Sequence, residues 1–265
     1  MDRVPPSASP GTNLSEAKRL LAIMARLRDP LSGCEWDLAQ DFTSIAPYTI
    51  EEAYEVADAI ARGDMAELKD ELGDLLLQVV FHSRMAEEAG LFNFEDVARS
   101  IGDKMEARHP HIFGAETGTM GETRWENLKE AERAEKGMVS ALDGVALALP
   151  ALMRAQKLQK RAARTGFDWP DPKGAQDKII EEIEELNEAS SEKEKTEEAG
   201  DLLFAAVNFV RANGVTAEDA LRAANAKFER RFRAMEEMAG DDFADLSLEQ
   251  QEELWQAVKR DENRV

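Results

Sequence analysis

Ten acidic residues recur in two spacings that are typical of a metal site. A Glu-Glu-x-x-Glu segment followed by a Glu-x-x-Asp segment occurs twice in the chain. On a helix, side chains three or four residues apart share a face, so each segment presents neighbouring carboxylates. Because the chain has only three histidines and one cysteine, we expect oxygen ligands and Mg²⁺, with Mn²⁺ also compatible. The predicted metal ligands are Glu51, Glu52, Glu55, Glu71 and Asp74 in the first half, and Glu181, Glu182, Glu185, Glu198 and Asp201 in the second.

Positioning these carboxylates requires two packed helices in each half. Apolar residues recur at three- and four-residue steps through residues 64–89 and 192–213, which predicts a helix carrying each Glu-x-x-Asp segment. Antiparallel packing on the preceding helix would bring the two segments together, with the first and third glutamates of Glu-Glu-x-x-Glu on one face. Gly73 and Gly200 lie inside these helices at a cost of about 1 kcal/mol each relative to alanine. We therefore expect another helix or a hydrated ion to approach the backbone there.

The rest of the chain is also predicted to be helical. Further helices are expected at residues 49–62, 94–109, 121–136, 177–189, 216–239 and 247–260, with Thr216 and Ser247 as N-caps. No stretch alternates with the two-residue period of a strand. The predicted fold class is all-α.

Five landmarks of the first half recur in the same order in the second. They are Gly-Cys-Glu-Trp at 33–36 (Gly-Phe-Asp-Trp at 166–169), the two acidic segments, Lys-x-x-x-Arg at 104–108 (227–231), and Trp125 with Lys129 (Trp255 with Lys259). We infer a duplicated helical module. The expected organisation is a flexible N-terminus at residues 1–13, a first module at 14–140 and a second at 141–265, with the boundary within residues 137–144.

Basic and aromatic residues near the acidic segments are candidates for binding a nucleotide. Lys-x-x-x-Arg spacing places two cations on one helix face, and arginine can bind phosphate oxygens through two parallel hydrogen bonds. Tryptophan can stack on a base. The sequence leaves open that these cations only balance nearby carboxylates and that the tryptophans belong to the core. The candidates are Lys104, Arg108, Trp125 and Lys129 in the first half, and Lys178, Lys227, Arg230, Arg231, Trp255 and Lys259 in the second.

Composition argues against several classes of protein. The 265 residues include 33 Lys plus Arg and 54 Asp plus Glu, a net charge of −21, which disfavours binding to a nucleic acid polymer. No apolar run approaches the ~20 residues that a membrane-spanning helix needs, so no membrane association is expected. A single cysteine, Cys34, suits a reducing compartment, and we expect a cytoplasmic protein.

The motifs together resemble the MazG family of nucleoside triphosphate pyrophosphohydrolases. The resemblance rests on the tandem Glu-Glu-x-x-Glu and Glu-x-Gly-Asp-Leu-Leu motifs, Gly-Cys-Glu-Trp-Asp at 33–37 and His-Pro-His-Ile-Phe-Gly at 109–114, and it extends over residues 14–260. It implies Mg²⁺-dependent hydrolysis of a nucleoside triphosphate to the monophosphate and pyrophosphate. It also implies broad base preference, a role in clearing unwanted nucleotides, and a homodimer that completes a four-helix bundle. Glu35, where the family often has proline, is a departure confined to a loop.

Within this family, the second module is expected to do most of the catalysis. Lys178 stands where the first half has Tyr48, and Arg230 adds a cation beside Arg231. We expect Glu182 to act as the general base. The other acidic residues of this half would then be ligands: Glu181, Glu185, Glu198 and Asp201.

Two other functions remain compatible with the sequence. One is a base-specific pyrophosphatase acting on dUTP, dCTP or phosphoribosyl-ATP. The other is an acidic helical dimer that acts by binding a regulatory protein partner. Metal-dependent release of pyrophosphate would exclude the second of these.

Overall fold

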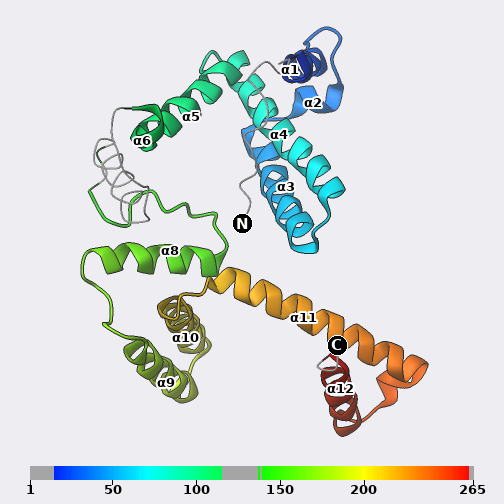
Figure 1. Ribbon diagram of the computed structural model, residues 1–265, viewed down its shortest axis with the longest axis vertical. Helices are drawn as coiled ribbons and strands as arrows, with labels where there is room; N and C mark the ends of the chain where they lie inside the picture. The colour runs from blue at the N-terminus through cyan, green and yellow to red at the C-terminus, as the bar shows by residue number, and fades with distance from the viewer. Residues whose placement is uncertain (1–14, 115–136, 138, 263–265) are drawn as a thin grey trace. The chain divides into compact units, whose positions relative to one another are not determined.

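The computed structural model describes residues 15–114, 137 and 139–262 (Figure 1). The described residues contain helices and no strand, which confirms the all-α class. The chain divides into two compact units, Met1–Leu128 and Lys129–Val265. This division falls outside the described residues, and the module boundary within residues 137–144 stays a prediction.

A helical hairpin dominates the first unit. Its helices are α1 (Ser15–Leu27), α2 (Glu35–Ala39), α3 (Phe42–Arg62), α4 (Met65–Glu88), α5 (Phe94–Arg108) and α6 (Pro110–Phe113). Helices α3 and α4 pack against each other as an antiparallel pair (Figure 1). Gly63 ends α3 with φ of 70°, a backbone conformation that disfavours other residues, and the Asp64 carboxylate caps α4. The turn is therefore short, and the two helices lie side by side.

One buried cation, Arg28, joins several segments of the first unit. Its guanidinium donates to the Glu88 carboxylate at 2.8–3.1 Å and to the backbone carbonyls of Asp37 and Gln40. Burial alone would raise the pKa of Glu88, but hydrogen bonds from Arg28 and Arg84 outweigh this effect and lower it. The ion pair therefore fixes the end of α1 and the α2 segment against α4. The apolar core beside it contains Met24, Ile45, Val80, Phe81 and Met85.

The second unit repeats the hairpin with α9 and α10. Its elements are α8 (Ala151–Arg164), α9 (Pro172–Glu188), α10 (Glu192–Ala212), α11 (Ala217–Ala239), the 3₁₀ helix η1 (Gly240–Asp245) and α12 (Leu248–Glu262). A reciprocal pair of hydrogen bonds between Ser191 and Glu194 begins α10. Helix α8 packs against α10, and α11 packs against α12. The α9–α10 hairpin is thus closed on one side by α8.

Most of the predicted helices are confirmed. Helices α4, α5, α10, α11 and α12 lie within two residues of their predicted bounds. Ser247 caps α12 as expected, through reciprocal hydrogen bonds with Gln250, whereas Thr216 makes no side-chain capping bond. Helices α3 and α9 begin earlier than predicted, because Asp41 and Asp171 cap them and the helices accommodate Pro47 and Pro172.

Four of the described α-helices were not predicted. These are α1, α2, α6 and α8. Glu35, which was expected in a loop, is the first residue of α2. The predicted helix at residues 121–136 lies outside the described residues. Helix α8 buries Gln156 and Gln159, so polar residues occupy part of its inner face. At Gly73 and Gly200, an added Cβ would meet nothing within 4 Å. No other helix of the described chain therefore packs closely against either glycine.

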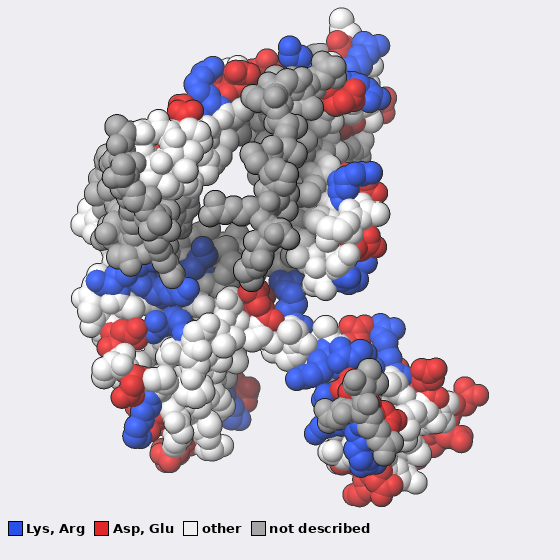
Figure 2. Space-filling view, viewed as in Figure 1, with Lys and Arg blue, Asp and Glu red and all other residues white. Residues whose placement is uncertain are grey.

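The described surface carries both signs of charge. Figure 2 shows acidic and basic side chains interleaved on the visible face. None of the described helices combines the length and apolar character needed to span a membrane.

Replacing Arg28 with alanine should destabilise the first unit by about 2–3 kcal/mol, because its partner Glu88 and two carbonyls would lose a buried donor. Urea denaturation of the full chain would measure the change. Arg19→Ala is the matched control, since the Arg19–Glu16 pair is exposed and should contribute less than about 1 kcal/mol. Equal effects of the two substitutions would contradict the assigned role of Arg28.

Candidate functional site

Three carboxylates of the second unit converge where α9 and α10 pack together. Glu182 and Glu185 of α9 and Glu198 of α10 each contribute an oxygen atom, and these three atoms lie within 4.8 Å of one another. Asp201 follows Glu198 by one helical turn and lines the adjoining pocket together with Glu182. This arrangement of carboxylate oxygens suits a divalent cation.

The register of α9 explains which glutamates converge. Ala175 and Glu182 are seven residues apart and only 1% and 3% exposed, so both lie on the face that packs inward. Glu181 is one residue out of this register and is exposed. The second and third glutamates of the motif therefore converge, and the expectation that the first and third would do so was wrong.

A lysine partly compensates the buried carboxylate. Lys178 Nζ lies 2.6 Å from Glu182 Oε1 and 2.9 Å from Glu181 Oε1. Hydrogen bonds to Glu182 and then to Glu181 raise the pKa of Lys178, which keeps it charged. Glu182 Oε2 is buried and has no hydrogen-bond partner among the described residues. An unpartnered buried carboxylate oxygen is costly, and a bound cation would remove that cost.

The other two members of the cluster also show the effect of crowding. Burial raises the pKa of Glu198, and the neighbouring charges of Glu185 and Glu182 raise it further. Burial likewise raises the pKa of Glu185, although Lys178 opposes the shift. Like charges held this close favour a cation between them.

A pocket of about 770 Å³ adjoins the cluster. Phe167, Trp169 and Phe204 give it aromatic walls, and Lys178 and Glu182 lie at its edge. The remaining lining residues are Leu142, Leu158, Gln159, Ala162, Gly166, Asp168, Asp201, Ala205, Asn208 and Arg211. Aromatic surface beside acidic and basic groups suits a ligand with a flat ring and charged groups.

An ion pair and a close ring contact hold the wall of this pocket. Arg211 donates to Asp168 at 2.6 and 3.1 Å and to Asn208 Oδ1, so α10 fixes the loop before α9. The indole of Trp169 lies against Gly174, where an added Cβ would come within 2.2 Å of the ring. Only glycine at position 174 leaves room for the indole in this position.

A second acidic cluster lies in the first unit. Oxygen atoms of Glu52, Glu55 and Glu71 lie within 4.8 Å of one another, while Glu51 is exposed and outside this group. Burial and then the charge of Asp74 raise the pKa of Glu52. The neutral side chain of Gln78 donates to Glu52 at 3.4 Å, in contrast to the lysine at the other cluster.

The remaining predicted substrate-binding residues are not part of the pocket lining. Arg230 and Arg231 on α11 pair with Glu262 on α12, and Arg231 lies over the ring of Trp255 at 5.4 Å. Lys227 and Lys259 lie on the same two helices, Lys104 and Arg108 lie on α5, and Trp125 and Lys129 lie outside the described residues. Their binding roles stay predictions.

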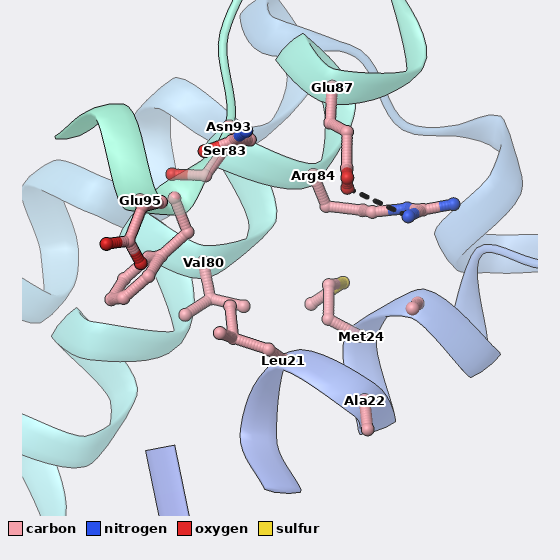
Figure 3. A pocket seen from close by; sticks show the side chains of 11 residues that line it. Leu21, Ala22, Met24, Val80, Ser83, Arg84, Glu87, Asn93 and Glu95 are labelled. Carbon is pink, nitrogen blue, oxygen red and sulfur yellow. Dashed lines mark hydrogen bonds and ion pairs between the residues drawn. The ribbon is translucent and has the colours of Figure 1, made fainter. Parts of the chain in front are cut away.

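A smaller pocket in the first unit is separate from the acidic residues. It has a volume of about 400 Å³ and lies between α1, α4 and the start of α5. Figure 3 shows Leu21, Met24 and Val80 around it, with Arg84 hydrogen-bonded to Glu87 at its edge. Neither Glu52 nor any other member of the first cluster lines it.

Comparison with known families and proteins agrees with this architecture. Residues 40–113 match the MazG nucleotide pyrophosphohydrolase domain, and residues 150–228 match the phosphoribosyl-ATP pyrophosphohydrolase family. The chain is thus a tandem of two related all-α domains of the nucleotide pyrophosphohydrolase class.

Two curated relatives cover nearly the whole chain. The nucleoside triphosphate pyrophosphohydrolase of Escherichia coli (strain K12) is 52% identical over 94% of this chain and 99% of its own length. The nucleoside triphosphate pyrophosphohydrolase/pyrophosphatase MazG of Thermotoga maritima is 44% identical over 91% of this chain and 95% of its own length. The chain belongs to the MazG family.

Several pocket residues were missed by sequence reasoning. Phe167 and Trp169 belong to Gly-Phe-Asp-Trp, one of the recurring segments. Its recurrence indicated a loop shared by the two modules but did not indicate what the loop does. Gln159, Asn208 and Arg211 stand in no recognisable motif, because their positions depend on how α8 and the loop before α9 pack on α10.

Replacing Asp168 with asparagine should lower stability at pH 7 by up to about 1 kcal/mol, because the charge paired with Arg211 is lost. The hydrogen bond from Arg211 lowers the pKa of Asp168 below its ordinary value of 3.8. The difference from wild type should therefore persist from pH 7 to about pH 4 and shrink below it, as the wild-type carboxyl is protonated.

Urea denaturation at several pH values would measure this difference. The exposed Lys173–Asp177 pair supplies the control, Asp177→Asn, which should change stability little at any pH. A difference for Asp168→Asn that is as large at pH 3 as at pH 7 would show that charge is not its cause.

Proposed function

We propose that this chain is a Mg²⁺-dependent nucleoside triphosphate pyrophosphohydrolase. It converts a ribo- or deoxyribonucleoside triphosphate and water into the monophosphate and pyrophosphate, with broad base specificity, and it removes unwanted nucleotides from the pool. The observation that carries the proposal is the group of three carboxylates within 4.8 Å beside an aromatic pocket. The names of both relatives support the same reaction.

The acidic cluster of α9 and α10 is the proposed metal site. Glu185 and Glu198 would hold the ion, with Asp201 and Glu181 next to them, and Glu182 would be left to act on the attacking water. Two observations favour Mg²⁺ or Mn²⁺ at this cluster. All of its candidate ligands are oxygen atoms, and Glu182 Oε2 is buried without a partner among the described residues. A bound divalent ion would lower the pKa of a water molecule and neutralise phosphate charge.

Glu182 is the proposed general base. Its Oε1 is bonded to Lys178, whereas Oε2 has no partner among the described residues and can accept a proton. As the water oxygen bonds to the α-phosphorus, its proton would move to Glu182 Oε2. The bond from the α-phosphorus to the α–β bridging oxygen breaks, and its electron pair leaves with pyrophosphate. Lys178 would offset the charge that develops on this leaving group.

The pocket is the proposed nucleoside site. Phe167, Trp169 and Phe204 offer aromatic surface, on which any base can stack because every base has a π-face. Stacking without many fixed polar contacts supports broad base specificity. The Asp168–Arg211 pair and Gly174 keep the Trp169 side of the pocket in place.

A homodimer is part of the proposal. Large apolar side chains on the hairpins are exposed in the single chain, among them Tyr48 at 42%, Ile183 at 44% and Leu203 at 60%. Such surfaces favour pairing of hairpins between subunits. The cations of α11 and α12 do not line the pocket of their own chain. In the dimer, they would reach the phosphate groups of a substrate bound by the other subunit.

Hydrolysis of phosphoribosyl-ATP is the second candidate activity. The match of residues 150–228 to the phosphoribosyl-ATP pyrophosphohydrolase family favours it. Its reaction would use the same cluster and would also release pyrophosphate, so only the substrate distinguishes the two activities.

Incubation with the eight common nucleoside triphosphates and with phosphoribosyl-ATP should separate these functions. We expect pyrophosphate from most of the eight when Mg²⁺ is present, and none in excess chelator, because the carboxylate cluster needs a cation to accept a triphosphate. Enzymatic detection of pyrophosphate and of single phosphate would measure both products. Turnover of phosphoribosyl-ATP alone would favour the second candidate, while release of single phosphates would refute the proposed bond cleavage.

The substitutions Glu182→Gln and Glu52→Gln compare the two modules directly. Removing the base at 182 should lower kcat at least about 100-fold, whereas the change at 52 should alter it less than about 3-fold. The reason is that only the α9–α10 cluster has Lys178 and lies beside the aromatic pocket described above. Near-normal turnover by Glu182→Gln together with loss in Glu52→Gln would assign catalysis to the first module instead.

A further inference from the structure

One buried polar atom of the pocket has no role in the reaction described above. Gln159 on α8 is 6% exposed and lines the pocket. Its side-chain nitrogen donates to the backbone carbonyl of Phe204 at 2.8 Å. Its side-chain oxygen, Oε1, is buried and has no hydrogen-bond partner among the described residues.

The hydrogen bond to Phe204 fixes which end of the Gln159 amide is the oxygen. A carbonyl only accepts, so the amide nitrogen must face it and the oxygen must take the other position. Rotating the amide by 180° would place two oxygen atoms in contact. Gln159 therefore presents an acceptor that cannot change to a donor.

Asn208 is oriented in the complementary way. Its Oδ1 accepts from Arg211 at 3.0 Å, which leaves its amide nitrogen as the group that can donate. Asn208 is 8% exposed and lines the same pocket. The pocket thus contains one oriented acceptor and one oriented donor.

These amides lie at a distance from the acidic cluster that suits the length of a nucleotide. Along α10, Asp201, Phe204 and Asn208 line the pocket at steps of about one turn, so Asp201 and Asn208 are about 10 Å apart along the helix axis. Gln159 is bonded to the middle of this row. With the phosphates at the cluster, the base would lie near the two amides.

We propose that Gln159 Oε1 accepts a hydrogen bond from an N–H group of the substrate base. This inference rests on the proposed function and specifies which bases the pocket accepts. Adenine, cytosine, guanine, uracil and thymine all carry an N–H donor next to an acceptor on their pairing edge. An acceptor and a donor that line the same pocket can therefore serve every common base. A base without such a donor leaves the oxygen of Gln159 buried and unpaired.

Purine riboside triphosphate, which lacks the amino group of ATP and has no N–H donor on its pairing edge, tests this directly. For the wild-type full chain with Mg²⁺, kcat/KM for ATP should exceed that for purine riboside triphosphate by about 10-fold or more. In Gln159→Met, which keeps the side-chain length and removes the acceptor, the ratio should fall below about 3. Pyrophosphate release measures both rates.

Gln156→Met is the matched control. Gln156 is also buried on α8, but it bonds to the backbone of Ala217 and Val215 and does not line the pocket. This variant should keep the wild-type preference for ATP. Circular dichroism would establish that both variants are folded.

The possible outcomes separate this inference from the proposed function. Equal kcat/KM for the two triphosphates in the wild-type protein would overturn the role of Gln159 and leave triphosphate hydrolysis intact. This comparison uses the wild-type protein alone. A preference retained in Gln159→Met would also overturn it. Hydrolysis of neither triphosphate, nor of any of the eight common ones, would overturn the proposed function and this inference with it.

Discussion

The site depends on burying a carboxylate between two packed helices. Glu182 is 3% exposed on the face of α9 that packs inward, in register with Ala175. Removing a carboxylate from water costs several kcal/mol, on the order of what a whole domain gains from folding, so it must be compensated. Lys178 satisfies one oxygen, and the other has no hydrogen-bond partner among the described residues. A divalent cation would complete the charge balance that Lys178 begins.

The two hairpins carry equivalent acidic residues, but the residues around the two clusters differ. In the second unit, Phe204, Ala205 and Asn208 line a pocket beside the cluster, and α8 closes one side. In the first unit, the residue at the position of Ala205 is Gln78, which is buried and bonded to Glu52. A glutamine side chain in place of a methyl group fills space next to the carboxylates. Duplication has therefore preserved the acidic cluster while its surroundings have diverged.

Local patterns made the helices and the acidic groups predictable from the sequence. The apolar steps of α4 and α10 and the repeated motifs were sufficient, because they depend on spacing within one helix. The choice between Glu181 and Glu182 could not be made this way, since it depends on which face of α9 packs on α10. Gln159 and Arg211 were missed for a related reason. Their roles arise from contacts between residues 43 to 45 positions apart.

No described lysine pairs with Glu52, and this has a consequence for folding. No ion pair within the described ranges involves Glu52, Glu55 or Glu71, and burial raises the pKa of both Glu52 and Glu71. A cation that binds this folded cluster and not the unfolded chain would stabilise the first unit by mass action, in proportion to the logarithm of its concentration. The second unit already has Lys178 as an internal counter-charge. Depleting divalent ions would therefore loosen one half of the molecule more than the other.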